Sequence, residues 1–372
     1  MTLYTDIPTR SEIDALWEAG PRAAISLYLE TRPDSSGEAE RIAYKNAVRE
    51  ALSQLDPADL EDLAGLADEL TILEDEEADD FWRYQARTLA VFATPSSLHT
   101  FRLPNRLTPA AVGGSRFLVR PLLRAVTFPQ TAYVLALAQG SVRLLETLPE
   151  IDAREVRLPG MPADVASAVG KSSIRGRSPI RRVQGSEGQK LRMAQYARLV
   201  DGGLRGMLSG QSVPLVVAAT EPLASIFRAH CSYPHLVPRS VASNPEGRGD
   251  GELVAAAREV LDGWYADQLE EQKARFVEST SQGRASSDVA DVARFATRGA
   301  VESLFLDIDT ALAGGVDERG EVTFSEYEGA SDVLDEIARR AWLSGARLFA
   351  IRKEDMPGGA SVAATLRYAP AA

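Results

Sequence analysis

Apolar residues recur along most of the chain at helical or strand spacing, and short polar stretches separate the patterned segments. Apolar positions three to four residues apart indicate an amphipathic helix, whereas alternation or a short continuous apolar run indicates a strand. In the first part of the chain this predicts a helix carrying Ile13, Leu16 and Trp17, a helix at 38–55, and strands at 24–29, 88–92 and 116–122. The acidic stretch 59–80 is typical of a solvated helix face and connector, and the stretch 104–114, with Pro and Gly, of a loop.

The middle of the chain predicts a strand at 131–138, a turn at Gln139-Gly140 and a second strand at 141–145, which together indicate a hairpin. A buried strand at 214–219 and a helix at 221–230 follow. The last part predicts helices at 252–276, 289–296 and 331–343 and strands at 300–308, 347–351 and 360–367. Strands separated by helices indicate α/β layers with a mixed sheet in the middle part and an α/β/α sandwich at the end.

The length of 372 residues favours two or three domains, and the changes of pattern divide the chain into three. We predict an N-terminal α/β domain at 1–122, a central domain at 123–250 and a C-terminal domain at 251–372. Hydrophobic residues make up 45% and charged residues 25%, which is typical of a globular protein. No apolar run approaches the roughly 18 residues of a membrane span, and the polar, acidic N-terminus is unlike a secretory signal. We therefore expect a cytoplasmic protein with no membrane partner.

One basic segment departs from the acidic background of the chain. The formal net charge is −12, yet residues 171–198 carry eight cations against the single acid Glu187, so the remaining residues carry −19. The first half of this segment predicts a mobile loop and the second half, from about Lys190, a helix. Arginine-rich loops and helix starts both bind phosphates, whereas a solvated loop, or one that pairs with an acidic face of the same chain, is the alternative. The predicted RNA-binding residues are Lys171, Arg175, Arg177, Arg181, Arg182, Lys190, Arg192 and Arg198.

Three further groups of residues could carry chemistry, and each has a structural alternative. Asp307 and Asp309 would share one face of a strand and could bind a metal, but without a further ligand we expect no metal site and no cofactor. Cys231, the only cysteine, lies between His230 and His235 and could act as a nucleophile, although Pro234 favours a structural role. The central strands TAYVLALA and PLVVAA carry no carboxylate, which argues against a nuclease.

Several blocks of sequence, in this order and spacing, resemble the bacterial members of the archaeo-eukaryotic release factor superfamily, the relatives of the eukaryotic class-one release factor and Pelota. AISLYLETRPD with ERIAYKNAVREAL resembles their N-terminal domain, and AYVLALAQGSVRLLE with PLVVAATEPLASIFRAHCSYPHLV resembles their central domain. ARFATRGAVESLFLDID, SGARLFAI and SVAATLRY resemble their C-terminal domain. The resemblance implies an RNase H-like central domain and an L7Ae-like C-terminal domain.

The resemblance also implies a site. Release factors carry a Gly-Gly-Gln loop that promotes hydrolysis of peptidyl-tRNA in the ribosome, and the matching positions here are Glu187, Gly188 and Gln189. The Gln189 backbone N–H would stabilise the oxyanion and its side chain would help position water, while Glu187 stands where the family has glycine. We expect Gly185–Gln189 to form a turn at the apex of the basic loop.

Three functions stay open on this evidence. The first is a factor that binds the ribosomal A site in rescue, release or hibernation, with ribosomal RNA and tRNA as partners and a translational GTPase as a further one. The second is a peptidyl-tRNA hydrolase that uses Gln189 and Gly188. The third is an adaptor that binds a protein away from the ribosome.

Overall fold

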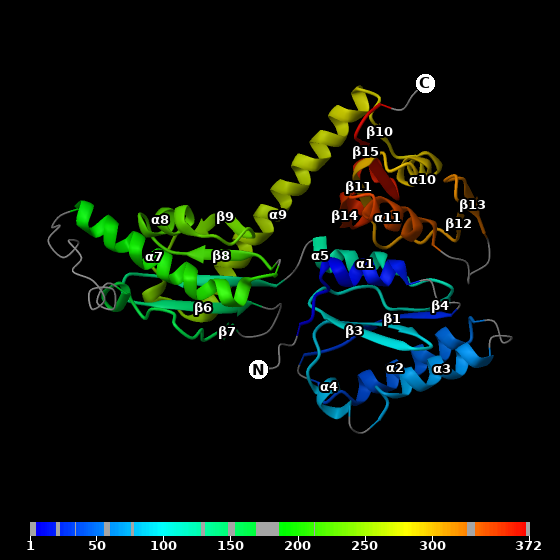
Figure 1. The fold of residues 1–372 in the computed structure, drawn as a ribbon, viewed down its shortest axis with the longest axis horizontal. Coiled ribbons are helices and arrows are strands. Elements are labelled where there is room, and N and C mark those ends of the chain that lie inside the picture. Colours follow the sequence, from blue (N-terminus) through cyan, green and yellow to red (C-terminus); the bar gives the residue numbers. More distant parts are fainter. Residues whose placement is uncertain are drawn as a thin grey trace. The chain divides into compact units, whose positions relative to one another are not determined.

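The computed structural model describes residues 5–19, 23–33, 35–55, 60–75, 78–127, 131–147, 153–168, 186–211, 213–325 and 332–369. The chain forms two compact units (Figure 1). Unit 1 comprises residues 1–128 and 270–372, and unit 2 comprises residues 129–269. Unit 2 is thus a continuous segment, whereas unit 1 is assembled from the two ends of the sequence.

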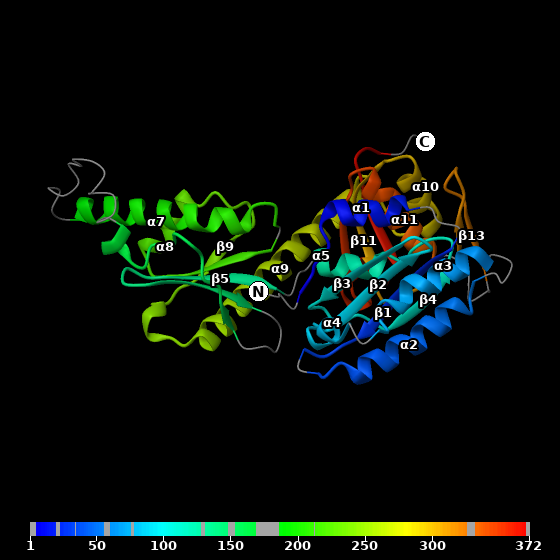
Figure 2. The same ribbon diagram turned by 60° about the horizontal axis from the view of Figure 1, so that its bottom comes forward.

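The N-terminal part of unit 1 is built on a four-stranded antiparallel sheet of order β3-β2-β1-β4. One face of β1 and β2 packs against helices α2 and α3 through Tyr44, Val48, Leu66 and Leu70. Figure 2 shows these two helices on one side of the sheet, with α1 on the other side. The elements are α1 (Arg10–Glu18), β1 (Ala24–Glu30), α2 (Glu38–Leu52), α3 (Leu60–Thr71), α4 (Asp79–Arg83), β2 (Thr88–Thr94), β3 (Ser97–Leu103), β4 (Ala110–Gly114), the 3₁₀ helix η2 (Arg120–Leu122) and α5 (Leu123–Thr127).

The C-terminal part of unit 1 is built on a second four-stranded sheet, of order β10-β15-β11-β14, in which β11 and β14 are parallel. The hairpin of β12 and β13 stands outside this sheet. The elements are the end of α9 (Asp250–Ser281), which belongs to this unit from Glu270 onward, β10 (Ala285–Ser286), α10 (Val289–Thr297), β11 (Val301–Asp307), β12 (Gly314–Val316), β13 (Val322–Phe324), α11 (Val333–Leu343), β14 (Arg347–Ile351) and β15 (Val362–Leu366).

The two parts of unit 1 share one hydrophobic core, which contains Ile13, Leu16 and Phe92 from the first part and Leu304 and Ile337 from the second. The rings of Trp17 and Trp342 meet edge to face with 5.4 Å between their centroids. The indole Nε1 of Trp342 also donates to Asp14 Oδ1 at 2.5 Å. Burial of this extent holds the two ends of the chain together.

A buried polar network also connects the two parts of unit 1. The Arg120 Nη2 atom lies 2.7 Å from Asp332 Oδ2, and Nη1 of the same guanidinium donates to the carbonyl oxygen of Asp307. The backbone N–H groups of Val119 and Arg120 donate to Asp335 Oδ1 at 2.9 and 2.5 Å. Asp332 is the N-cap residue of α11, so this network fixes residues 118–120 at the start of that helix.

Unit 2 is a three-layer domain with a mixed five-stranded sheet of order β7-β6-β5-β8-β9. Strands β5, β8 and β9 are parallel, and β6 and β7 are antiparallel to their neighbours. Helices α7 and α8 cover one face, and Leu253, Ala257 and Leu261 of α9 cover the other. The remaining elements are β5 (Ala132–Leu137), β6 (Val142–Thr147), β7 (Arg154–Glu155), α7 (Ser186–Leu208), β8 (Leu215–Ala218), α8 (Leu223–His230) and β9 (Leu236–Val241).

The predicted fold class is confirmed: the chain is α/β with several sheets, and the middle sheet is mixed. The predicted strand at 116–122 is wrong, because Pro121 cannot donate to a sheet and these residues form an irregular segment that ends in η2. The loop predicted at 104–114 is wrong at its end, where β4 pairs with β1. The boundaries of the three predicted domains and the RNase H-like and L7Ae-like assignments stay predictions.

Candidate functional site

Helix α7 carries the described part of the candidate site. Its apolar side chains repeat every three or four residues and therefore fall on one stripe of the helix. That stripe is buried against the sheet of unit 2 through Met193, Tyr196, Ala197, Val200 and Leu204. The packing on the sheet decides which residues of α7 face solvent.

The residues predicted for the site lie at the start of this helix. Gln189, Lys190 and Arg198 are exposed, Arg192 is partly exposed and Gly188 is buried. The other predicted cations lie outside the described residues; they are Lys171, Arg175, Arg177, Arg181 and Arg182. The structure thus brings Gln189 and three of the predicted cations onto one helix.

The turn predicted at 185–189 is wrong from Ser186 onward, because α7 begins there and includes Gly188 and Gln189. Proline is absent from Ser186 to Leu208, and each of the four glycines of the helix, Gly188 among them, costs only about 1 kcal/mol. The packed stripe further along α7 offsets that cost. Gln189 is therefore presented by the first turn of a rigid element, beside backbone N–H groups that a helix start leaves without helical partners.

A buried carboxylate that the sequence did not reveal anchors the middle of α7. Asp201 is 5% exposed and accepts hydrogen bonds from the backbone N–H of Ser232 at 2.8 Å and from its hydroxyl at 3.0 Å. The Arg205 guanidinium lies 2.9 Å from the same carboxylate. These contacts tie α7 to the loop after α8. They join positions about 30 residues apart, so no local pattern could have predicted them.

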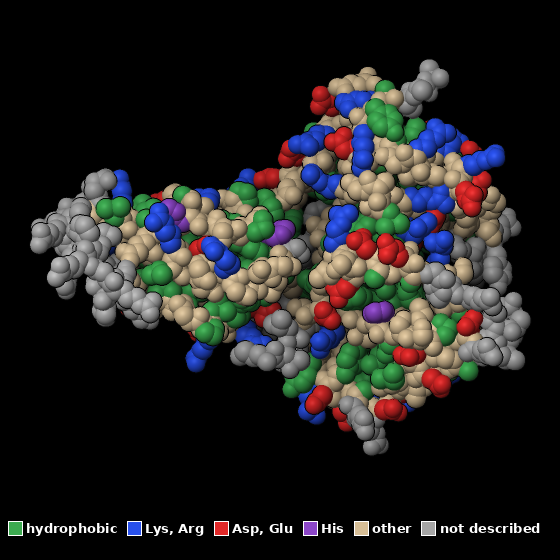
Figure 3. Space-filling view, viewed as in Figure 1, with side chains coloured by type: hydrophobic (Ala, Val, Ile, Leu, Met, Phe, Trp, Pro, Cys, Tyr) green, Lys and Arg blue, Asp and Glu red, His purple; other side chains and the backbone are tan. Residues whose placement is uncertain are grey.

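The charge of the chain is unevenly divided. Unit 2 contains 16 Lys and Arg and 14 Asp and Glu, a net charge of +2, so the rest of the chain carries −14. On the face drawn in Figure 3, Lys and Arg lie among Asp and Glu over unit 1, and both signs also occur over the described part of unit 2. The surplus of unit 2 comes from the basic segment 171–198, and a concentration of cations there favours an anionic partner.

Cys231 and the pair Asp307 and Asp309 are the other groups with candidate chemistry. Burial raises the pKa of the Cys231 thiol, which lowers its thiolate fraction. Strand β11 ends at Asp307, so Asp309 does not continue its face, and Asp307 Oδ1 accepts the backbone N–H of Asp309 at 3.0 Å. Within the described ranges, no group of three or more His, Cys, Asp or Glu could hold a metal ion. No helix in the described part of the chain combines the length and the apolar character that crossing a membrane requires.

Unit 2 is therefore an α/β domain with a mixed sheet and a basic helix start that presents a glutamine. Residues 129–267 match the model for bacterial archaeo-eukaryotic release factor family 11. This match of the central segment confirms the resemblance predicted from the sequence. No curated protein matches the chain.

Three solved structures are among those that match the chain. The archaeal translation termination factor aRF1 is 13% identical, with 97% of this chain and 99% of that chain covered and a TM-score of 0.25. Archaeal Pelota, from a model of ribosome-bound Pelota and ABCE1, is 12% identical, with 98% and 95% covered and a TM-score of 0.41. Dom34 of S. cerevisiae, a translation termination-like factor that interacts with Hbs1, is 10% identical, with 77% and 75% covered and a TM-score of 0.41. At these values the likeness supports no functional inference.

Proposed function

We propose that the protein is a ribosome-associated translation factor whose unit 2 contacts ribosomal RNA or tRNA through the basic segment 171–198. The observation that carries the proposal is the position of Gln189, which is exposed in the first turn of a cationic helix within a release factor domain. A factor with this task works in the cytoplasm. A translational GTPase that delivers it to the ribosome is part of the same proposal.

The cations of the segment supply the affinity. Arginine and lysine neutralise phosphates and release condensed counterions, so binding weakens as salt rises. If about four cations meet phosphates of unpaired RNA, log K falls with log salt with a slope of about −3. The acidic remainder of the chain repels RNA elsewhere, so the contact is confined to this segment.

Co-sedimentation with purified ribosomes at increasing salt tests the proposal. The test variant replaces four cations of the segment by alanine, namely Arg175, Arg177, Arg181 and Arg182. The matched control replaces four exposed arginines of unit 1, namely Arg83, Arg298, Arg319 and Arg347. We expect the test variant to leave the ribosome at lower salt than the control variant. Failure of the unmodified protein to sediment with ribosomes at low salt would refute the proposal and favour the adaptor.

Hydrolysis of peptidyl-tRNA is the second candidate function. In that reaction water attacks the ester carbonyl, and the bond to the tRNA ribose oxygen breaks. The Gln189 side chain, exposed beside the free N–H groups of the helix start, would position this water. Gly188 would let the backbone approach the ester closely.

Peptide release from a stalled ribosomal complex tests this function. The Gln189→Ala variant should lose release and keep co-sedimentation, because the cations remain. The Glu187→Gly variant restores the family tripeptide and should release peptide at least as fast as the unmodified protein. Equal release by the unmodified protein and Gln189→Ala would show that Gln189 has no part in hydrolysis.

A further inference from the structure

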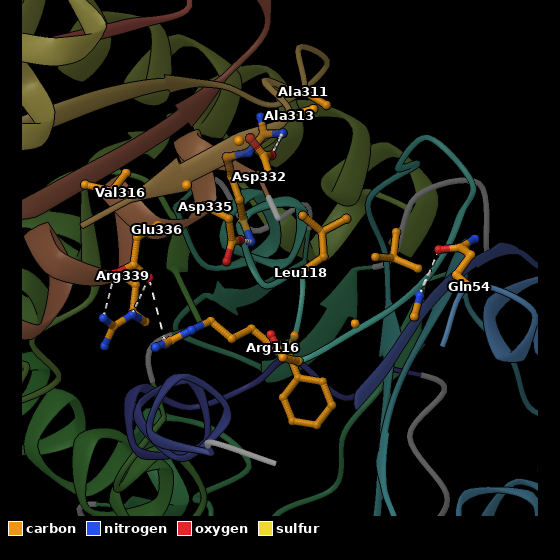
Figure 4. A pocket seen from close by; sticks show the side chains of 18 of the residues that line it. Gln54, Arg116, Leu118, Ala311, Ala313, Val316, Asp332, Asp335, Glu336 and Arg339 are labelled. Carbon is orange, nitrogen blue, oxygen red and sulfur yellow. Dashed lines mark hydrogen bonds and ion pairs between the residues drawn. The ribbon is translucent and has the colours of Figure 1, made fainter. Parts of the chain in front are cut away.

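Unit 1 contains a cavity of about 1060 Å³, lined by both its N-terminal and its C-terminal part (Figure 4). One side is formed by Gln54 at the end of α2 and by residues 111–118. The other side is formed by residues 313–318 and the first turns of α11. The lining residues Ser115, Asp317 and Glu318 are exposed, so the cavity opens to solvent.

Most of the charged side chains in the lining neutralise one another. Arg120 pairs with Asp332, and Glu336 lies 2.7 Å from Arg339 and 2.6 Å from Arg340. Acids nevertheless outnumber cations by one. The lining contains Arg116, Arg120, Arg339 and Arg340 and, against them, Asp317, Glu318, Asp332, Asp335 and Glu336.

Asp335 has no cationic partner of its own. Its side chain points into the cavity, and the residue is only 8% exposed. Its Oδ1 atom accepts the two backbone N–H groups of Val119 and Arg120, whereas no described residue donates to Oδ2. Oδ2 is not among the sealed side-chain atoms that lack a partner, so it is open to the cavity, and a ligand there can donate a hydrogen bond to it.

We propose that this cavity binds an organic cation, a primary ammonium or guanidinium group that donates a hydrogen bond to Asp335 Oδ2. The excess of acids in the lining favours a positive ligand. Leu118, Val316 and the adjacent glycines supply apolar walls for a methylene chain. The volume exceeds that of one amino-acid side chain and is typical of sites for larger ligands. The cation is therefore either a polyamine or an arginine side chain carried by a peptide.

Binding is coupled to a proton at Asp335. Burial, and next the nearby charge of Asp332, raise the pKa of Asp335 to about 7. A cation stabilises the carboxylate and displaces the proton, so its binding weakens by up to about tenfold for each pH unit below pH 7. The charged and titratable groups around Asp335 are Tyr28 of β1, Arg116, Arg120 of η2, the N-cap Asp332, and Glu336 and Arg339 of α11.

Titration calorimetry of the full-length protein tests the proposal, with spermidine and a short arginine-containing peptide as the two probes. The observed binding enthalpy is measured in two buffers that differ in ionisation enthalpy, and the difference gives the number of protons released on binding. We expect at least one of the two probes to bind at pH 6.5, and the protein to release a proton when it does. The probe with the higher affinity shows whether the cation belongs to a polyamine or to a peptide. The Asp335→Asn variant should bind at least tenfold more weakly. Glu302→Gln, which neutralises an exposed acid on β11 outside the lining, should bind as the unmodified protein does.

Two results would overturn the proposal. The first is absence of binding by both probes at millimolar concentration. The second is equal weakening by Asp335→Asn and Glu302→Gln, because attraction to the acidic surface as a whole would then explain the binding. Proton release by the unmodified protein is an independent measure, so the proposal stays testable whatever the stability of either variant.

Discussion

Replacing Asp335 by asparagine isolates the energetic effect of one buried charge. Asparagine has nearly the same shape as aspartate, and its Oδ1 can still accept the backbone N–H groups of Val119 and Arg120. Its amide group lies where Oδ2 lies in the native residue, and it never ionises. The substitution therefore removes the charge while it keeps the hydrogen bonds that hold residues 119–120 at the start of α11.

The sign of the effect follows from the proton balance. The pKa of Asp335 rises from 3.8 in the unfolded chain to about 7 in the folded protein. Between these values the folded state binds a proton that the unfolded state has lost, so stability decreases as pH rises through this window and levels off above it. A shift of about three units corresponds to at most about 4 kcal/mol. Asp335→Asn should therefore gain stability over the native protein progressively from pH 4 to pH 8.

Urea unfolding at a series of pH values measures this difference, and hydrogen exchange of the α11 amides assigns it to unit 1. Glu302→Gln is the control, because Glu302 is exposed and its neutralisation should leave the pH dependence of unfolding unchanged. If Asp335→Asn is less stable than the native protein at pH 8, or follows the same pH profile, the argument from buried charge is wrong.

Three further substitutions or reactions test other parts of the structure. Arg120→Ala leaves the carboxylate of Asp332 buried without its cation and should cost about 3–5 kcal/mol in urea unfolding; a loss below about 1 kcal/mol would contradict the buried pair. Phe227→Ala should cost about 3–5 kcal/mol in the unfolding of unit 2 and leave the exchange of α11 unchanged, whereas coupled loss in both would show that the units unfold together. Cys231 should react with iodoacetamide more slowly than free cysteine at pH 7 because burial raises its pKa, and equal rates would show that the thiol is accessible.

The sequence predicted those elements whose apolar spacing matches the side chains that are buried. Strand β1 was expected at 24–29 and is observed at Ala24–Glu30, since its alternate residues enter the two cores on either face of the sheet. The hairpin of β5 and β6 and the helix α10 were predicted within two residues of their observed bounds. In each case the apolar pattern and the local turn signals agree with the tertiary packing.

The sequence could not predict the elements that tertiary contacts create. Strand β4 has the sequence AAVGG, which is poor in strand-forming residues, and it is extended because it pairs with β1. The apolar residues Phe117, Val119 and Leu122 are buried in the core of unit 1, near α11, rather than in a sheet. The sequence could not predict the cavity either, because its lining comes from four separate segments, 53–54, 111–120, 311–318 and 332–340. Of the candidate site, the sequence predicted only the cations, because their concentration in one segment of an acidic chain is visible in the composition.

The shared core of unit 1 has a consequence for folding during synthesis. Unit 2 is one uninterrupted stretch, so it can fold as soon as it leaves the exit tunnel. Ile13 and Leu16 must wait for Leu304 and Ile337, made some three hundred residues later, before their core is complete. At 5–20 residues per second this delay is roughly 15–60 s. A nascent chain cut short in its last quarter would leave that early apolar surface uncovered, a ready target for chaperones and proteases.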